Sequence, residues 1–285
     1  MIRAADVLAA LRERLAAASP TATLDAELLV ARVLGTGRAS LAADPDRALR
    51  PEELLALESL TRRRLAGEPV AYLTGRREFW SLELEVTSAV LVPRPETELL
   101  VERTLAAIAG LPRPAVLDLG TGSGADAIAI ASSRPEAVVT ATDDSAAALE
   151  VAKRNAVRHG LRNIRFCAGS WCVPLQGARF DAIASNPPYV ADGDAALVAL
   201  GFEPRLALAA GPEGLDALAA ICAGAPALLA PVGQLLLEHG AHQGAAVRGL
   251  MRAAGFAGVA TARDLAGHER VTAGTLSRKA LESAS

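Results

Sequence analysis

Residues 116–124 are Val116-Leu117-Asp118-Leu119-Gly120-Thr121-Gly122-Ser123-Gly124, an apolar run that leads into three alternating glycines. The apolar run predicts a buried strand, and the alanine-rich residues 125–131 predict a helix directly after it. Glycines at such a junction let a ligand approach the backbone closely and leave the N–H groups of the helix facing that ligand. A second expected strand, residues 137–142, ends at Asp143, about 20 residues further on, where a βαβ unit places a carboxylate on ribose hydroxyls. The pattern therefore predicts a site for an adenosine-containing ligand.

A second polar motif follows another expected strand, residues 180–185, and consists of Asn186-Pro187-Pro188-Tyr189. Asn offers an amide oxygen as acceptor, and each Pro offers a carbonyl without an N–H that could compete for it. A planar NH2 group could therefore donate one N–H to the Asn186 oxygen and the other to the Pro187 carbonyl, while Tyr189 packs on its flat face. The alternative is a strand that ends in a proline-rich turn, which Asn-Pro dipeptides favour. Together with the glycine loop, the motif indicates a site that handles an amino group.

The glycine loop alone leaves a rival function open. Gly120, Gly122 and Ala125 also satisfy the looser G-x-G-x-x-A form of a dinucleotide fingerprint, so a nicotinamide-dependent oxidoreductase is an alternative. Two features favour amino-group chemistry: Asp118 lies two residues before the first glycine, and residues 186–189 follow the fourth expected strand. Hydride transfer has no evident need for an Asn-Pro-Pro-Tyr motif.

These residues resemble the protein-(glutamine-N5) methyltransferases that modify bacterial peptide-chain release factors. The resemblance covers nearly the whole chain. The glycine loop and residues 186–189 alone would indicate only the wider class of amino-group methyltransferases. The narrower resemblance rests on Glu68-Pro69-Val70-Ala71-Tyr72-Leu73-Thr74-Gly75, Arg77-Glu78-Phe79-Trp80-Ser81-Leu82, Val92-Pro93-Arg94-Pro95-Glu96-Thr97-Glu98, Phe202-Glu203-Pro204-Arg205, Leu237-Glu238-His239-Gly240, Asp264-Leu265-Ala266-Gly267 and Arg270-Val271-Thr272.

The resemblance implies S-adenosyl-L-methionine as cofactor and S-adenosyl-L-homocysteine as product. We expect Gly120, Thr121, Gly122, Ser123 and Gly124 to contact the methionine and ribose portion of the cofactor. We expect Asp143 to accept both ribose hydroxyls and Asn186 to border the sulfonium. The resemblance adds Trp171 near the adenine, although a lone Trp after a strand can equally be a core residue.

The implied substrate is the glutamine of the Gly-Gly-Gln motif of class-1 release factors, bound by Asn186, Pro187, Pro188 and Tyr189. An amide nitrogen is a poor nucleophile because its lone pair is delocalised, so catalysis by Asn186, Pro187 and Tyr189 would consist of placing that nitrogen in line with the methyl group. No dedicated base is required. Alternative substrates are a ribosomal-protein glutamine or an exocyclic amino group of a nucleic-acid base, which would have to be flipped. A cofactor-binding scaffold without transferase activity is a third hypothesis.

The pattern of the chain predicts two domains. Residues 1–75 form an expected helical bundle that binds the substrate protein, with Thr23 as a cap candidate for the helix over 24–34. Residues 76–97 form a hairpin or extended connector, and residues 98–285 form the methyltransferase domain. Expected strands near 115–119, 138–143, 164–168, 180–185, 233–238, 256–263 and 270–276 alternate with helices, which predicts an α/β fold with a mostly parallel sheet. The resemblance implies the class I S-adenosylmethionine-dependent methyltransferase sheet of seven strands, with the last strand antiparallel.

Composition and charge exclude some classes of partner. The 285 residues carry a formal net charge of -3, which gives no general attraction to nucleic acid. We therefore expect a protein partner, no stable nucleic-acid partner, and a monomer. No segment has the length and apolarity of a membrane span or of a signal peptide, so the cytoplasm is the expected location. Cys167, Cys172 and Cys222 lack paired spacing and are expected to be reduced thiols.

A few further residues admit more than one interpretation. Glu238, His239 and His242 lack the H-E-x-x-H spacing, so we expect no metal site. Arg62-Arg63-Arg64 is typical of a solvated helix face, although a partner surface is a second hypothesis. Asp126 and Asp144 are acidic where the family usually has apolar or variable residues. Asp126 either suits the N-terminus of its helix or repels the cofactor carboxylate.

Overall fold

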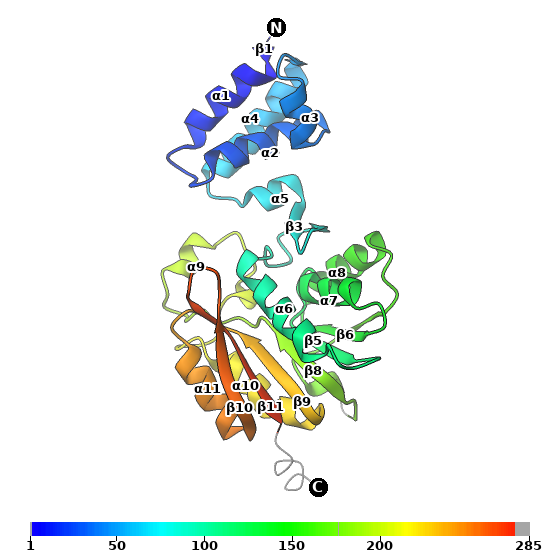
Figure 1. The fold of residues 1–285 in the computed structure, drawn as a ribbon. Coiled ribbons are helices and arrows are strands. Elements are labelled where there is room, and N and C mark those ends of the chain that lie inside the picture. The colour runs from blue at the N-terminus through cyan, green and yellow to red at the C-terminus, as the bar shows by residue number, and fades with distance from the viewer. Residues whose placement is uncertain (1, 176, 277–285) are drawn as a thin grey trace. The chain divides into compact units, whose positions relative to one another are not determined.

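The computed structural model describes residues 2–175 and 177–276. The chain folds as two compact units, one within residues 1–76 and the other within residues 77–285 (Figure 1). The first unit is helical, with one short antiparallel strand pair. Its elements are β1 (Ile2–Arg3), α1 (Ala4–Leu15), α2 (Ala22–Leu34), α3 (Arg38–Ala43), β2 (Ala48–Leu49), α4 (Pro51–Leu65) and α5 (Val70–Thr74).

The core of the helical unit includes apolar residues at helical spacing, such as Leu11 and Leu15 of α1 and Val30 and Leu34 of α2. Helix α2 begins one residue earlier than its expected cap, so the prediction that Thr23 caps this helix is wrong. Thr21 precedes the helix instead, and its hydroxyl donates to the Asp25 carboxylate rather than capping the backbone. The Thr21 hydroxyl is bound to the buried Asp25 carboxylate and therefore does not cap α2.

The three arginines of α4 have different partners. Arg64 Nε donates to Asp25 Oδ2 at 2.7 Å, and the Asp25 side chain is only 2% exposed. Arg63 forms a bidentate pair with Glu68, and Arg62 lies 3.7 Å from Glu58. Because Arg64 neutralises a buried carboxylate, it belongs to the interior of the unit, whereas Arg62 lies on the solvated face.

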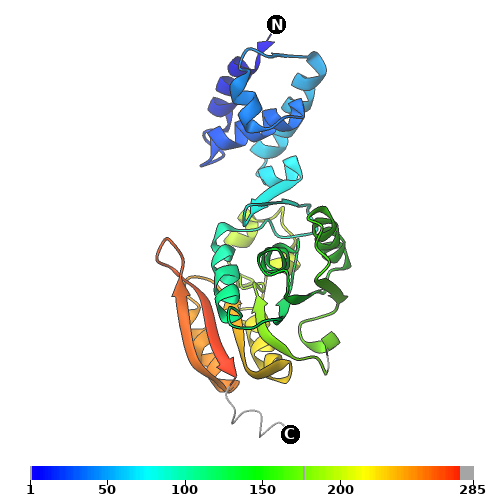
Figure 2. The same cartoon turned by 45° about the vertical axis from the view of Figure 1, so that its right-hand side comes forward.

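The second unit is an α/β domain around one seven-stranded sheet, as predicted. The strand order is β10-β11-β9-β8-β5-β6-β7, in which the strands β7, β6, β5, β8 and β9 are parallel and β11 is antiparallel to both of its neighbours. Figure 2 shows the β10–β11 hairpin at the edge of this sheet. The elements are β3 (Arg76–Phe79), β4 (Leu82–Glu85), η1 (Pro95–Thr97), α6 (Glu98–Ala107), β5 (Ala115–Leu119), α7 (Ala125–Ser133), β6 (Val138–Asp143), α8 (Ala146–Arg158), β7 (Ile164–Ala168), η2 (Val173–Leu175), β8 (Phe180–Ser185), α9 (Ala196–Ala199), η3 (Arg205–Ala207), α10 (Asp216–Gly224), η4 (Ala225–Ala227), β9 (Leu229–Glu238), α11 (Gly244–Ala253), β10 (Phe256–Arg263) and β11 (Glu269–Leu276).

Alternate residues of the central strands enter two different cores. Val116 and Ala184 pack with residues of α6, α7 and α8, whereas Leu117 and Ile183 pack with residues of α10 and α11. Both faces of the sheet are therefore covered by helices, which explains why the strands are apolar throughout rather than alternating. Because both faces are covered, the carboxyl ends of the strands are where the sheet can bind a ligand.

The connector folds against the second unit. Strands β3 and β4 form a two-stranded sheet, and Trp80 and Ser81 between them both have positive φ, +53° and +58°. Positive φ at both central residues is the geometry of the type I′ turn that joins tight hairpins. The indole Nε1 of Trp80 donates to Ser133 Oγ at 2.9 Å, and its backbone N–H donates to Glu98 Oε1 at 2.9 Å. These bonds fasten the connector to α7 and α6.

Within the described ranges, no helix has the length and apolarity needed to span a membrane.

Gly124 provides a test of the packing at the start of α7. Its φ is +86°, and a Cβ there would lie 2.9 Å from Ile128 Cδ1 and 3.1 Å from Ala152 Cβ, whereas a Cβ on Gly122 (φ +54°) would meet no atom within 4 Å. We expect Gly124→Ala to lower the free energy of unfolding by about 2–4 kcal/mol, because left-handed strain adds to overpacking. Gly122→Ala is the matched control and should lose about 1 kcal/mol from strain alone. Urea denaturation of the two variants measures both losses, and equal losses would contradict the packing argument.

Candidate active site

The register of the parallel strands brings the polar motifs to one edge of the sheet. Leu119 of β5 pairs with Thr142 of β6 and with Ser185 of β8, and Ser185 in turn pairs with Leu237 of β9. The residue after each of these positions therefore lies at the same level, at the carboxyl ends of four neighbouring strands. These residues are Gly120, Asp143, Asn186 and Glu238. The sheet thus gathers residues that are far apart in the sequence.

The glycine loop is held by its own backbone and by a buried carboxyl. The N–H groups of Gly120 and Thr121 both donate to the Thr142 carbonyl at 2.9 Å. Thr121 Oγ1 donates to Asp118 Oδ2 at 2.6 Å, and the N–H of Ala127 also binds the Asp118 carboxyl. Burial raises the pKa of Asp118 to about 7, against the lowering effect of these two donors. Asp118 is therefore a structural residue that joins the loop to the first turn of α7.

Asp143 binds the same loop from the neighbouring strand. Its Oδ2 accepts from the N–H of Gly122 at 2.8 Å and its Oδ1 from the N–H of Ser145 at 2.9 Å. Burial raises the pKa of this carboxyl, while the two backbone donors lower it. Each carboxylate oxygen retains a further lone pair, so Asp143 can still accept hydrogen bonds from a ligand.

A cavity of about 460 Å³ opens above these strand ends. Its volume is in the range of small-molecule sites, and its lining is mostly apolar with a few polar groups, as in such sites. The Trp171 ring covers the glycine loop, since a Cβ on Gly120 would lie 3.4 Å from the indole Cζ3. Of the residues expected to form the site, those that line the cavity are Gly120, Thr121, Gly122, Ser123, Asp143, Trp171, Asn186 and Pro188. Gly124, Pro187 and Tyr189 are not among the lining residues; Gly124 and Pro187 are buried and Tyr189 is half-buried.

Asn186 extends from the end of β8 into the cavity wall. Its Nδ2 donates to Thr97 Oγ1 at 3.1 Å. Within the described ranges, its Oδ1 accepts no hydrogen bond from the protein, and neither does the Pro187 carbonyl. The two acceptors predicted to bind an NH2 group thus have no donor among the described residues.

Tyr189 is anchored through its backbone. Its carbonyl accepts from Gln243 Nε2 at 3.0 Å, and the same amide group also donates to the Gly214 carbonyl and accepts from the N–H of Gly240. Burial, with a contribution from Glu238, raises the pKa of the Tyr189 phenol to about 12, so the hydroxyl stays neutral. Gln243 therefore fixes the end of the motif, a role that no local sequence signal indicated.

A second pair of residues fixes the edge of the cavity. Glu203 is buried; its Oε1 accepts from the guanidinium of Arg94 and its Oε2 from the N–H of Val92 at 3.0 Å. Arg94 lines the cavity, and the pair joins the segment before α6 to the segment after α9. Both residues belong to motifs that carry the family resemblance, but no local pattern indicated that they pair.

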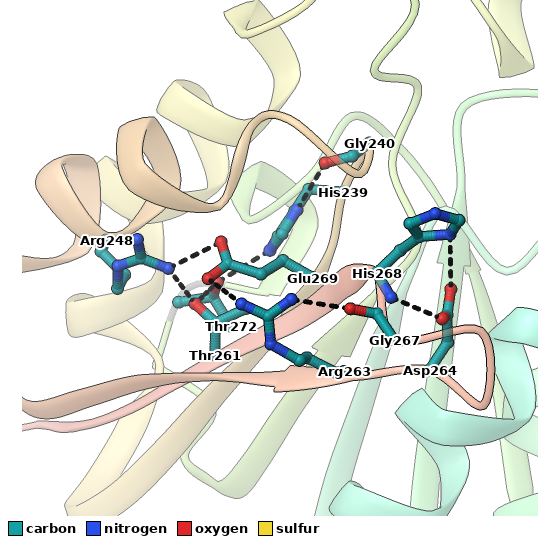
Figure 3. A network of polar contacts seen from close by, with 10 residues as sticks. All are labelled: His239, Gly240, Arg248, Thr261, Arg263, Asp264, Gly267, His268, Glu269 and Thr272. Carbon is teal, nitrogen blue, oxygen red and sulfur yellow. Dashed lines mark hydrogen bonds and ion pairs between the residues drawn. The ribbon is translucent and has the colours of Figure 1, made fainter.

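The histidine at the end of β9 belongs to a hydrogen-bond network rather than to an exposed cluster (Figure 3). His239 is fully buried, with its Nδ1 2.9 Å from the Gly240 carbonyl and its Nε2 2.8 Å from Thr272 Oγ1. The network continues through Thr261 to Arg248 and Glu269. Burial lowers the pKa of His239, which favours the neutral ring, in which one nitrogen donates and the other accepts. In the part of the chain that the structure describes, no three His, Cys, Asp or Glu side chains gather as a metal site.

Among the described residues, two carboxyls near the cavity each have one buried oxygen without a hydrogen-bond partner. Asp126 lines the cavity from the first turn of α7, but its Oδ1 is buried without a hydrogen bond, and so is Oε2 of Glu238. Burial raises the pKa of Asp126 well above its usual value, and the nearby Asp118 and Glu238 raise it further. Burial also raises the pKa of Glu238 to about 7.

Comparisons with known proteins identify two matching domain families and several similar proteins. The model of the PrmC N-terminal domain matches residues 6–75, and the model of the methyltransferase small domain matches residues 95–201. The release factor glutamine methyltransferase of Xylella fastidiosa (strain Temecula1) is 51% identical over 253 residues, which cover 88% of this chain and 92% of that protein. The release factor glutamine methyltransferase of Burkholderia pseudomallei (strain K96243) is 50% identical over 268 residues, which cover 91% of this chain and 94% of that protein.

One solved structure shows the fold alone. The 16S rRNA N2 G1207 methyltransferase of Thermus thermophilus, in complex with AdoMet and guanosine, matches with a TM-score of 0.53 at 22% sequence identity. The match covers 70% of this chain and 49% of that chain.

Asp126 provides a test of the electrostatics. We expect Asp126→Asn to increase the free energy of unfolding at pH 8 by about 1–3 kcal/mol, because it replaces a buried carboxyl whose ionisation burial disfavours, at nearly constant shape. A carboxyl whose pKa is higher in the folded than in the unfolded state destabilises the fold increasingly as the pH rises from the unfolded pKa towards the folded pKa. The increase in the free energy of unfolding caused by Asp126→Asn should therefore be smaller at pH 5 than at pH 8. Urea denaturation at the two pH values would measure it.

Asp144→Asn is the matched control for this test. Asp144 is exposed at the same cavity, so its replacement should change the stability by less than about 0.5 kcal/mol. A loss of stability in Asp126→Asn at pH 8 would show that the carboxylate has a favourable partner.

Proposed function

Because the chain belongs to the release factor glutamine methyltransferase family, we propose that it methylates the side-chain amide nitrogen (N5) of the glutamine in the Gly-Gly-Gln motif of class-1 peptide-chain release factors. The observation that carries the proposal is the pair of free acceptors at Asn186 Oδ1 and the Pro187 carbonyl. Asn186 lines a cavity that also carries a glycine loop and a carboxylate, and Pro187 follows it directly in the chain.

The residues around the cavity fit S-adenosyl-L-methionine. Gly120, Thr121, Gly122, Ser123 and Gly124 would hold its methionine and ribose portion. The remaining lone pairs of Asp143 would accept the ribose hydroxyls, and the Trp171 ring would flank the adenine. When bound, the cofactor supplies a methyl group on a positively charged sulfur and leaves as S-adenosyl-L-homocysteine.

The protein would act on the amide by holding it. Asn186 Oδ1 and the Pro187 carbonyl would each accept one N–H of the glutamine side chain, which fixes the direction of the nitrogen lone pair. Positive charge grows on this nitrogen as the N–C bond forms, so both acceptors bind more strongly in the transition state than in the ground state. The nitrogen then loses a proton, which water can accept. Pro188 and Tyr189 would shape the surface against which the planar amide packs.

The same proposal assigns the substrate protein and the part of the chain that binds it. We assign the substrate protein to class-1 release factors, with residues 1–75 as the helical domain that binds it and residues 98–285 as the catalytic domain. The net charge of -3 argues against a stable nucleic-acid partner and against the alternative substrate, an exocyclic base nitrogen. A cytoplasmic monomer is the simplest form of such an enzyme. A ribosomal-protein glutamine remains the alternative acceptor, since its amide group is the same.

The reaction can be tested by mass spectrometry. The purified protein would be incubated with S-adenosylmethionine and a bacterial release factor, and the peptide that contains the Gly-Gly-Gln motif would be measured. We expect a gain of one methylene on that glutamine, and no gain with Asn186→Ala, since one acceptor of the amide is lost. The affinity of Asn186→Ala for S-adenosylhomocysteine, measured by calorimetry, should stay within about threefold because no charged contact is removed.

Two results would count against this assignment. If the wild type binds S-adenosylhomocysteine but leaves the release factor unmodified, the acceptor lies elsewhere, with ribosomal proteins as the next candidates. If Asn186→Ala methylates as fast as the wild type, residues 186–189 do not hold the amide.

The cofactor site can be tested without turnover. We expect Asp143→Ala to weaken S-adenosylhomocysteine binding by about 10- to 100-fold, because hydrogen bonds to a carboxylate contribute about 1.5–3 kcal/mol. Asp144→Ala removes the neighbouring exposed carboxylate and is the matched control. Calorimetric titration of both variants measures the difference, and an unchanged affinity in Asp143→Ala would remove this residue from the site.

A further inference from the structure

We propose that Thr97 is a positioning residue that sets which way round the Asn186 amide stands. This inference rests on the function proposed above, because it explains how Asn186 comes to present an acceptor to the glutamine. Thr97 contributes through Asn186 and need not touch the substrate amide itself.

The starting point is an ambiguity in every asparagine side chain. Its amide carries an acceptor oxygen and a donor NH2 group that are nearly equal in size, and a half-turn about the last side-chain bond exchanges them. A glutamine NH2 group can be bound only by the oxygen. If the Asn186 amide stood the other way round, two NH2 groups would face each other. The protein must therefore hold the donor end of Asn186 away from the substrate.

Thr97 provides the partner for that donor end. Asn186 Nδ2 donates to Thr97 Oγ1 at 3.1 Å, and Oδ1 is left without an internal donor in the described ranges. Both residues line the cavity, and Thr97 is only 4% exposed, so little water competes for the bond. The bond joins positions 89 residues apart and connects the end of β8 to the start of α6.

The hydroxyl of Thr97 is not needed to start a helix. Thr97 is the last residue of η1, which runs directly into α6, and its own backbone is helical. Here its side chain makes no cap hydrogen bond. The oxygen is directed to Asn186 instead, which indicates a role in the site rather than in starting the helix.

Glu238 adds a reason why the hydroxyl acts as an acceptor towards Asn186. The Thr97 hydroxyl stabilises the ionised form of this buried carboxyl. When the Thr97 hydroxyl donates to the ionised carboxyl, its oxygen lone pairs remain for another donor, and the Asn186 NH2 group is that donor. Asp126, Tyr189, Arg94, Glu96 and Arg270 are the other ionisable groups whose charges interact with Glu238.

The experiment compares Thr97→Val with Thr97→Ser in the full-length protein. Valine keeps the shape and removes the hydroxyl, whereas serine keeps the hydroxyl. With a release factor as substrate, we expect Thr97→Val to lower kcat by about 10- to 100-fold. Without the Thr97 hydroxyl, Asn186 Oδ1 would no longer be held toward the glutamine, and misplacing a group that orients the substrate lowers the rate by about this factor. Thr97→Ser should retain kcat within about threefold, a change that would reflect only lost packing. The dissociation constant for S-adenosylhomocysteine should stay the same in both variants.

Thr104→Val is the matched control for the loss of a buried threonine. Thr104 is also on the α6 segment and fully buried, and its hydroxyl donates to the Leu100 carbonyl at 2.8 Å. This change should lower the melting temperature at least as much as Thr97→Val and leave kcat unchanged. A loss of kcat in Thr104→Val equal to that in Thr97→Val would overturn the proposal, because any weakening of α6 would then suffice.

A second measurement does not depend on turnover. The side-chain NH2 resonances of Asn186, assigned by their loss in Asn186→Ala, should exchange slowly with solvent in the wild type and in Thr97→Ser. They should exchange faster in Thr97→Val. Unchanged exchange in Thr97→Val, or an equal loss of kcat in the serine and valine variants, would overturn the proposal. A wild type that methylates no release factor would instead contradict the proposed function, and the exchange measurement would still decide the role of Thr97.

Discussion

The parallel pairing of β5 with β6 on one side and β8 on the other is the constraint on which the site depends. Leu119 is level with both Thr142 and Ser185, so the chain leaves the sheet at the same height on three neighbouring strands. The connections from β5 and from β8 lead to helices on opposite faces of the sheet, which opens a crevice between them. Side chains alternate between faces, so a slip of one residue in β8 would turn Asn186 away from the glycine loop.

The charges around this crevice distinguish between the two ligands that a glycine loop can accept. Of the described residues that line the cavity, Asp126, Asp143, Asp144 and Asp216 are acidic, and the basic Arg94 is already paired with Glu203. A dinucleotide would bring its pyrophosphate to the glycine-rich turn, where these carboxylates would repel it. A ligand with a sulfonium and an ammonium group is positively charged at these positions, so the same carboxylates would attract it. The acidic wall therefore favours a methyl donor over a nicotinamide dinucleotide, a distinction that the spacing of the glycines could not make.

The parts of the structure that follow from local sequence were predictable. Apolar runs such as residues 116–119 and 180–185 form the central strands, and the antiparallel last strand is confirmed. β9 begins at Leu229, before the expected residue 233, because its pairing with β8 shifts register after Phe180 and continues beyond the irregularity. The missed residues act over long sequence separations: Gln243 binds a carbonyl 54 residues away, and Asn155 binds Ser123 across 32 residues. No periodicity or motif encodes such contacts, since they exist only once the sheet has formed.

The residues that would touch the ligands are each held by a residue from another element. Asn155 of α8 donates to the Ser123 carbonyl of the glycine loop at 2.9 Å, and Gln243 holds Tyr189 in the same manner. Thr97 holds Asn186. Hydrogen bonds of this kind restrict the side chains to one arrangement before a ligand arrives, so less freedom is lost on binding. The positions of the site residues therefore depend on α8, on the segment before α11 and on the start of α6 as much as on the two motifs. A variant can keep both motifs intact and still lose the geometry that they need.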